Sequence, residues 1–186
     1  MSGKIILLNG ASSSGKSTLA CSLQDTLPEP FWHFSIDHLR EARVLPTERS
    51  QSGVFSWIAL RPQFFEGFHR CLPALAEAGN NLVVEHIVES QAWMHRLVKL
   101  LRHADVFFVG LHCPLEELER REQTRGDRRI GEARADFQIA HAFCVYDLEI
   151  DSTQFVETNV HAVISEWNVR QRPSAFERMA RLVPTD

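Results

Sequence analysis

An octapeptide near the N-terminus constrains the fold of this chain more than any other segment. Residues 10–17 read G-A-S-S-S-G-K-S, which fits the pattern G-x-x-x-x-G-K-[S/T]. The apolar run Ile5–Asn9 precedes it, and the helix-compatible stretch Ser17–Leu27 follows it. A strand, a glycine-rich loop and a helix in this order are the context in which the pattern binds phosphate. The segment is therefore predicted to be a phosphate-binding loop.

Each position of this loop has an expected role. The glycines permit backbone conformations in which successive N–H groups converge on one anion, and the following helix adds the positive end of its dipole. Lys16 is expected to reach the β- and γ-phosphates of ATP, and Ser17 to offer its hydroxyl to Mg²⁺. A simple Gly/Ser turn is the alternative, but such a turn does not need a Gly-Lys-Ser ending. The predicted ATP-binding residues are Gly10, Ala11, Ser12, Ser13, Ser14, Gly15, Lys16, Ser17 and Thr18.

Composition limits the remaining classes. Hydrophobic residues make up 44% and charged residues 24% of the 186 residues, which is typical of a globular chain, expected here to be one domain over 1–186. The net charge of −4 gives no overall footprint for nucleic acid or for an anionic membrane surface. The 4 cysteines form no C-x-x-C pair, and the N-terminal apolar run is too short to span a membrane. We therefore expect a cytoplasmic protein with reduced thiols; no oligomeric state follows.

Short apolar runs alternate with amphipathic stretches along the chain. Continuous apolarity, rather than strict alternation, is typical of strands that are covered on both faces. Strands are predicted at Lys4–Asn9, Phe31–Ile36, Asn81–His86, Val106–His112 and Leu148–Asp151. Helices are predicted at Lys16–Leu27, Asp37–Leu45, Pro62–Ala78, Gln91–Arg102, Leu115–Arg125 and Ile130–Tyr146, with one or two more after Thr153. This order predicts an α/β fold with a five-stranded parallel sheet, helices on both faces, and a ligand beyond the carboxyl ends of the strands.

The segments at these strand ends are similar to one known family. The strings I-L-L-N-G-A-S-S-S-G-K-S, L-P-E-P-F-W-H-F-S-I-D, A-G-N-N-L-V-V-E, A-D-V-F-F-V-G-L-H-C, E-Q-T-R-G-D-R and Y-D-L-E-I-D-S-T resemble the chloramphenicol phosphotransferase family of P-loop kinases. The likeness extends over most of the chain, from Lys4 to Thr153. It implies a three-layer, nucleotide-kinase-like fold with a small arginine-bearing lid over approximately residues 114–131. It also implies ATP- and Mg²⁺-dependent phosphorylation of a small-molecule hydroxyl.

The resemblance also assigns catalytic and nucleotide-binding residues. Asp37 corresponds to the family's base, and the R-x-x-x-R-G-D-R segment places Arg121, Arg125 and Arg128 on the ATP phosphates. Lys16 and Arg128 then join Asp37 as catalytic residues. The alternative for Asp37 is a helix N-cap, and the alternative for the arginines is a solvated helix face balanced by glutamates. A nucleic-acid patch is disfavoured, because acidic residues are interleaved with the arginines.

The chain departs from the family after the third strand. Members carry an Asp-Asp pair there, whereas this chain has Glu85-His86. Glu85 can still help to hold Mg²⁺ through water, but the imidazole of His86 changes the polarity that faces the acceptor. Both residues are therefore candidates for the acceptor site, and the identity of the acceptor stays open.

The segment between the second and third strands is rich in aromatic residues. Phe55 and Trp57, on a predicted loop, are candidates for the walls of an acceptor pocket. Phe64 and Phe68 stand four residues apart, so we assign them to helix packing on the core.

Three functions are compatible with these patterns. The first is a kinase that transfers the γ-phosphate of ATP to a small-molecule alcohol, with chloramphenicol as the acceptor that the resemblance implies. The second is a kinase of a sugar or another polar metabolite, which an arginine cluster near the acceptor would favour and the aromatic segment disfavours. The third is a nucleotide-binding regulatory module without turnover, which the intact Lys16, Ser17 and Asp37 argue against.

Overall fold

A single parallel sheet organises the protein. The structure, a computed structural model, describes residues 2–46, 48–49, 52–125 and 130–183. The described strands are β1 (Lys4–Asn9), β2 (Phe31–Phe34), β3 (Asn81–His86), β4 (Asp105–His112) and β5 (Leu148–Asp151). They pair in parallel in the order β2-β3-β1-β4-β5. The predicted α/β fold with five parallel strands is confirmed.

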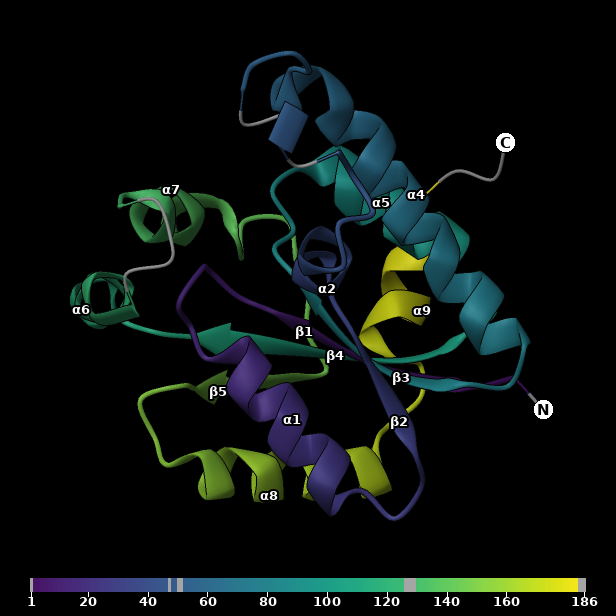
Figure 1. Cartoon of the computed structure of the whole chain (residues 1–186). Helices are drawn as coiled ribbons and strands as arrows, with labels where there is room; N and C mark the ends of the chain where they lie inside the picture. The colour runs from purple at the N-terminus through teal and green to yellow at the C-terminus, as the bar shows by residue number, and fades with distance from the viewer. Residues whose placement is uncertain (1, 47, 50–51, 126–129, 184–186) are drawn as a thin grey trace.

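Helices cover both faces of the sheet (Figure 1). On one face lie α1 (Lys16–Thr26) and α8 (Val156–Val169), and on the other lie α4 (Trp57–Glu77), α5 (Gln91–Leu100) and α9 (Ala175–Ala180). The short α2 (Ile36–Glu41) follows β2, while α6 (Leu115–Arg125) and α7 (Glu132–Ile139) lie past the end of β4. This three-layer arrangement leaves the carboxyl ends of the central strands open between α1, α2 and α6.

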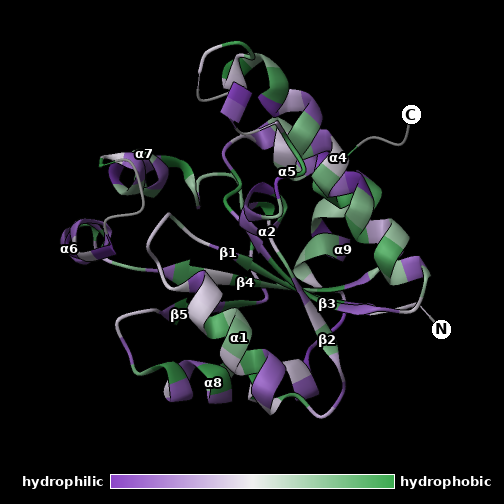
Figure 2. Ribbon diagram, viewed as in Figure 1, coloured by the Kyte–Doolittle hydropathy of each residue, from purple (hydrophilic) through white to green (hydrophobic). Residues whose placement is uncertain are grey.

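The core consists of two layers, one on each face of the sheet. Ile5 and Leu7 pack with the helices α4, α5 and α9, and Ile6 and Leu8 pack with α1 and α8. All four side chains are fully buried, as expected for a strand with helices on both sides. Figure 2 shows the same contrast, since the middle of β4 is hydrophobic while α6 and α7 are mostly hydrophilic.

Two serines set helix boundaries that differ from the prediction. β2 ends at Phe34 because the Ser35 hydroxyl accepts a 3.2 Å hydrogen bond from the His38 amide and so begins α2. α4 begins at Trp57 rather than at Pro62, because Ser56 caps it in the same way. Trp57 therefore lies in the first turn of a helix and not on the predicted loop.

The segment after α6 is helical over a shorter range than predicted. α7 covers Glu132–Ile139 instead of Ile130–Tyr146. It begins after Gly131, whose φ of 99° is in the left-handed region and cannot continue a right-handed helix. The described residues contain no helix that is long and apolar enough to cross a membrane. Cys21, Cys71, Cys113 and Cys144 all have free thiols.

Candidate active site

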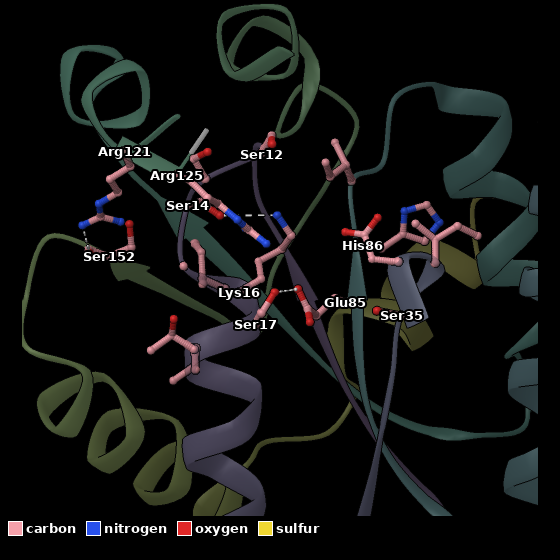
Figure 3. A pocket seen from close by; sticks show the side chains of 18 of the residues that line it. Ser12, Ser14, Lys16, Ser17, Ser35, Glu85, His86, Arg121, Arg125 and Ser152 are labelled. Carbon is pink, nitrogen blue, oxygen red and sulfur yellow. Dashed lines mark hydrogen bonds between the residues drawn. The ribbon is translucent and has the colours of Figure 1, made fainter. Parts of the chain in front are cut away.

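A cavity of about 420 Å³ lies at the carboxyl ends of the strands. It brings together the loop residues 12–18 with Asp37, Glu85, His86, Arg121 and Arg125, so that four different segments of the chain meet there. In Figure 3 the arginines lie on one side of Lys16, and Ser35 and His86 lie on the other. We name the end next to the loop and α6 the nucleotide end, and the end next to α2 and α4 the acceptor end, after the roles that the sequence predicts for their residues.

The backbone of the loop is shaped to surround an anion. Ser13 and Gly15 have φ values of 64° and 89°, and no described side chain caps the N-terminus of α1. The first amides of this helix are therefore available to phosphate oxygens. Gly10 is required for a different reason than predicted, because a Cβ there would lie 2.7 Å from the Leu111 carbonyl oxygen.

The ammonium group of Lys16 is held inside the curve of the loop. Its Nζ donates hydrogen bonds to the carbonyl oxygens of Gly10 (2.8 Å) and Ala11 (2.7 Å). The side chain lines the cavity although the residue is only 9% exposed. A cation in this position adds a point charge to the anion-binding amides of the loop.

Glu85 connects the loop helix to the second strand. Its Oε2 accepts a 2.8 Å hydrogen bond from the Ser17 hydroxyl, and its Oε1 pairs with Nε2 of His33 on β2. Burial opposes ionisation of this carboxyl, but the His33 hydrogen bond and the charge of Lys16 outweigh it and hold its pKa below the ordinary value. A hydroxyl beside an ionised carboxylate fits the oxygen ligands that Mg²⁺ prefers, bound directly or through water. His33 could not be predicted as a site residue, because the sequence around a histidine in a short strand does not indicate which residue it contacts.

Asp37 faces the acceptor end of the cavity from the first turn of α2. Ser35, and not Asp37, is the N-cap of this helix, so the capping alternative for Asp37 is wrong. The carboxylate is half-buried, and Arg40 lies 3.4 Å from it. The Asp37 carboxylate therefore lines the cavity and does not cap the helix.

The aromatic wall of the cavity comes from the middle of α4. Phe65 and Phe68 line it, and Phe68 also belongs to the core, as predicted. Phe55 and Trp57 do not line it: the Arg49 guanidinium covers the Phe55 ring at 4.3 Å, and Trp57 packs against Phe64. Phe65 and Phe68 are on the side of α4 that faces the sheet, whereas Phe55 precedes the helix and Trp57 lies about three turns before Phe68.

The arginines of α6 lie at the nucleotide end. Arg121 donates a 3.0 Å hydrogen bond to the Ser152 carbonyl oxygen and pairs with Glu117, and both Arg121 and Arg125 line the cavity. Arg120 is exposed and pairs with the same glutamate, as expected for a surface charge. Arg128 lies outside the described residues.

With this geometry in place, comparison with known proteins gives the family. Residues 3–168 match the family described as chloramphenicol phosphotransferase-like protein. The chain belongs to this family. A Mycobacterium tuberculosis protein named "Putative O-phosphotransferase" is 31% identical over 202 aligned positions, which cover 96% of this chain and 88% of the relative.

Solved structures with low identity share the fold of this chloramphenicol phosphotransferase-like protein. The APS kinase CysC of Mycobacterium tuberculosis, in complex with AMPPNP and APS, has a TM-score of 0.68 at 19% identity, covering 90% of this chain and 98% of that one. A gluconokinase from Sinorhizobium meliloti has a TM-score of 0.60 at 16% identity, covering 97% and 94%. These likenesses confirm the P-loop kinase fold.

His86, where this family member departs from the family's Asp-Asp pair, contacts a second buried histidine. Nε2 of His86 lies 2.7 Å from Nε2 of His69 on α4, so one ring donates a proton and the other accepts it. Burial lowers the pKa of His69 to about 4 and that of His86 to about 3. The pair is therefore neutral at physiological pH, and it presents an uncharged ring to the acceptor end.

A buried polar network supports the loop of this chloramphenicol phosphotransferase-like protein from below. The Asn9 amide donates to the Ala140 carbonyl oxygen (2.6 Å) and to the Tyr146 hydroxyl (2.7 Å), and its oxygen accepts from the Val88 amide (2.9 Å). The Asp136 carboxylate of α7 accepts a 3.0 Å hydrogen bond from the Ser12 amide. The loop is thus fixed to the β3–α5 connection and to α7 at once.

Proposed function

We propose that the protein is an ATP-dependent small-molecule kinase that transfers the γ-phosphate to an alcohol hydroxyl, as in a chloramphenicol 3-O-phosphotransferase. The observation that carries the proposal is the single cavity that holds the phosphate loop with Lys16, the Ser17–Glu85 pair and Asp37. Phosphoryl transfer requires little more than charge stabilisation and positioning, and these residues can provide both. The family membership supports the same reaction.

The nucleotide end has the groups that bind a triphosphate. The loop amides and Lys16 would bind the β- and γ-phosphates, and Ser17 and Glu85 would hold Mg²⁺, which neutralises phosphate charge when it is bound. Arg121 and Arg125 would contact the nucleotide from the lid over residues 114–131, with Arg128 as a further ligand. Closure of such a lid excludes water and protects ATP from hydrolysis.

The acceptor end has the groups that orient an alcohol. Asp37 would hold the acceptor hydroxyl and take its proton as the bond to phosphorus forms. Phe65 and Phe68 give this end an apolar, aromatic surface that suits a ring-bearing acceptor better than a sugar. Chloramphenicol is therefore the first acceptor to test.

A transfer assay with labelled ATP tests the proposal. The full chain with MgATP is incubated with chloramphenicol and, separately, with simple sugars such as glucose, and labelled product is separated from phosphate. We expect label on chloramphenicol that depends on Lys16. Faster labelling of a sugar would replace the acceptor class, and labelled phosphate alone with every alcohol would contradict the kinase assignment.

A further inference from the structure

A buried histidine contacts the carboxylate of the proposed metal site from outside the cavity. Glu85 lines the cavity, whereas His33 does not. Nε2 of His33 pairs with Oε1 of Glu85, and both side chains are only 9% exposed. An ionised carboxylate only accepts hydrogen bonds, so Nε2 carries a proton and donates it to Oε1 whatever the charge of the ring. Oε2 is then the oxygen that meets the Ser17 hydroxyl (Figure 3).

The register of the sheet brings these two side chains together. His33 on β2 lies opposite Val83 on β3 in a parallel pair, so both side chains point to the same face of the sheet. Glu85 stands two residues after Val83 and therefore points to that face as well. The helix α1 packs on this face (Figure 1).

The helix α1 contacts both members of the pair. Ser17 and Cys21 are four residues apart, so they lie about one turn apart on the same side of α1. Ser17 donates to Glu85, and the Cys21 sulfur lies 3.8 Å from Nδ1 of His33. The His38 ring packs edge-on against the His33 ring, with 4.4 Å between the ring centres. The imidazole is therefore held at both nitrogens and on its face, and it keeps one orientation toward Glu85.

The length of the Glu85 side chain explains why such a restraint matters. The family carries aspartate here, and the glutamate of this chain has one more rotatable bond. A side chain with more rotamers loses more conformational entropy when a ligand orders it, which weakens binding. A hydrogen bond that orders Glu85 before the metal arrives removes this cost.

We propose that His33 is a positioning residue for the metal: it fixes Oε1 of Glu85, so that Oε2 and the Ser17 hydroxyl form a preset pair of oxygens for Mg²⁺ or its water ligands. This inference rests on the metal site of the proposed function. His33 acts only through Glu85, because it does not line the cavity. Partners that orient a metal-binding side chain typically change the metal affinity by about 10–100-fold.

Binding of Mn²⁺ tests the proposal without requiring turnover. Mn²⁺ is the probe because its EPR signal reports the free ion, and ADP is kept below the concentration of the full chain so that little free ADP competes for the metal. The half-saturating Mn²⁺ concentration is measured for each variant. The dissociation constant of ADP without metal is measured in parallel, because damage to the phosphate loop would weaken it.

The variants separate reach from chemistry at one position. His33→Gln keeps an N–H group at about the reach of Nε2, whereas His33→Asn has the same amide on a side chain one methylene shorter, and His33→Ala has none. Glu85→Gln alone and combined with His33→Ala completes a double-mutant cycle. His112→Ala is the matched control, because His112 also pairs with a glutamate at a strand end but does not line this cavity.

We expect His33→Ala and His33→Asn to raise the half-saturating Mn²⁺ concentration about tenfold or more, with the metal-free ADP dissociation constant within about twofold of wild type. His33→Gln should restore most of the metal affinity, and His112→Ala should bind Mn²⁺ as the wild type does. In the Glu85→Gln background, His33→Ala should cause no further loss, because the residue through which it acts is already changed.

Three results would overturn the inference. Wild-type Mn²⁺ affinity in His33→Ala, or equal affinities in His33→Asn and His33→Gln, would show that the hydrogen bond to Oε1 does not position the metal ligand. Losses that multiply in the double variant would show that His33 does not act through Glu85. In each of these cases a loss of affinity in Glu85→Gln would still support the metal site of the proposed function. If Glu85→Gln bound Mn²⁺ as tightly as the wild type, that metal site would itself be contradicted, and the inference with it.

Discussion

The Ser17 hydroxyl donates a 2.8 Å hydrogen bond to the Glu85 carboxylate, although the two residues are 68 positions apart in the chain. The sheet accounts for this contact, because Glu85 pairs in register with Leu8 on the strand that leads into the phosphate loop. The first turn of α1 and the end of β3 are thereby held together. A metal ion at this point would be bound by both elements. The same hydrogen bond would then fix the position of the proposed nucleotide site relative to the proposed acceptor site.

Glu85→Gln should weaken Mg²⁺ binding without abolishing nucleotide binding. The amide keeps the shape of the side chain and can still contact Ser17, but it removes the charge that attracts the metal. We expect the Mg²⁺ concentration for half-maximal activity to rise about 10–100-fold. The rate of ADP release as a function of Mg²⁺ concentration checks this, and calorimetric titration with ADP checks that nucleotide binding is kept, with Glu149→Gln at the exposed His112 pair as the control. An unchanged Mg²⁺ dependence would remove Glu85 from the metal site.

Lys16→Ala should abolish most phosphoryl transfer. The ammonium lies within the loop, and the charge it adds there is required most when negative charge develops on the transferred group. We expect kcat to fall by about 10²–10³-fold, measured by ADP release coupled to a dehydrogenase. Lys4→Ala is the matched control, since Lys4 pairs with Glu29 on the surface. Near-normal turnover of Lys16→Ala would contradict the loop assignment.

Asp37→Asn should reduce kcat while ATP binding survives. Since Ser35 caps α2, the exchange leaves the helix start intact; it removes the proposed proton acceptor and the charge that faces Arg40. A decrease in kcat of about 10²–10⁴-fold is expected, with the dissociation constant for ATP within about twofold of wild type. Ser35→Ala serves as the comparison, because it should destabilise the helix start by about 1 kcal/mol. If Asp37→Asn turned over normally, another group would have to act as the base.

The sequence was informative wherever local chemistry decides the structure. The predicted bounds of β1, β3 and β5 agree with the structure, and for β1 and β3 the reason is that apolar runs that end in polar residues leave few alternatives. The cavity also gathers Lys16, Ser17 and Glu85, as expected when parallel strands end at one edge.

Positions that depend on helix start and phase could not be predicted in this way. Ser56 begins α4 before Pro62, so Trp57 lies in the first turn of the helix, about three turns before Phe68; Phe65 and Phe68 line the cavity, while Phe55 and Trp57 do not. The partners of His33 and His69 are likewise set by tertiary packing, since each pairs with a residue on β3. A single sequence contains no signal for such long-range pairs.

The His69–His86 pair predicts a loss of stability in mild acid. Both pKa values lie below the ordinary 6.5, at about 4 and about 3, because burial disfavours the charged rings. Above pH 6.5 neither state binds these protons, and as the pH falls below 6.5 the unfolded chain binds them first. Stability is therefore full above pH 6.5 and falls toward pH 4, by about 2 kcal/mol for each ring at pH 5.

His69→Gln isolates this contribution. Glutamine can still donate a hydrogen bond to His86, but it does not titrate. We expect the variant to lose less unfolding free energy than the wild type between pH 7.5 and pH 5, measured by urea denaturation. His95→Gln, at an exposed position of α5, should behave as the wild type. The same pH slope in the wild type and in His69→Gln would show that the pair is protonated in the folded state.

Gly110→Ala should destabilise the fold through Tyr146. A Cβ at Gly110 would lie 2.7–2.9 Å from three atoms of the Tyr146 ring, which also packs on Phe108 at 4.7 Å between ring centres. The ring would have to move, and its hydroxyl would lose the bond from Asn9 that supports the phosphate loop. We expect a loss of about 1–3 kcal/mol in urea denaturation.

Gly67→Ala is the matched control for Gly110→Ala. Gly67 lies inside α4, and a Cβ built there meets no described atom within 4 Å. Because alanine has the higher helix propensity, this exchange should stabilise the protein by about 0.5–1 kcal/mol. The two substitutions add the same methyl group, so opposite signs attribute the Gly110 effect to the Tyr146 contact. A Gly110→Ala protein as stable as wild type would mean that Tyr146 is not fixed where the loop needs it.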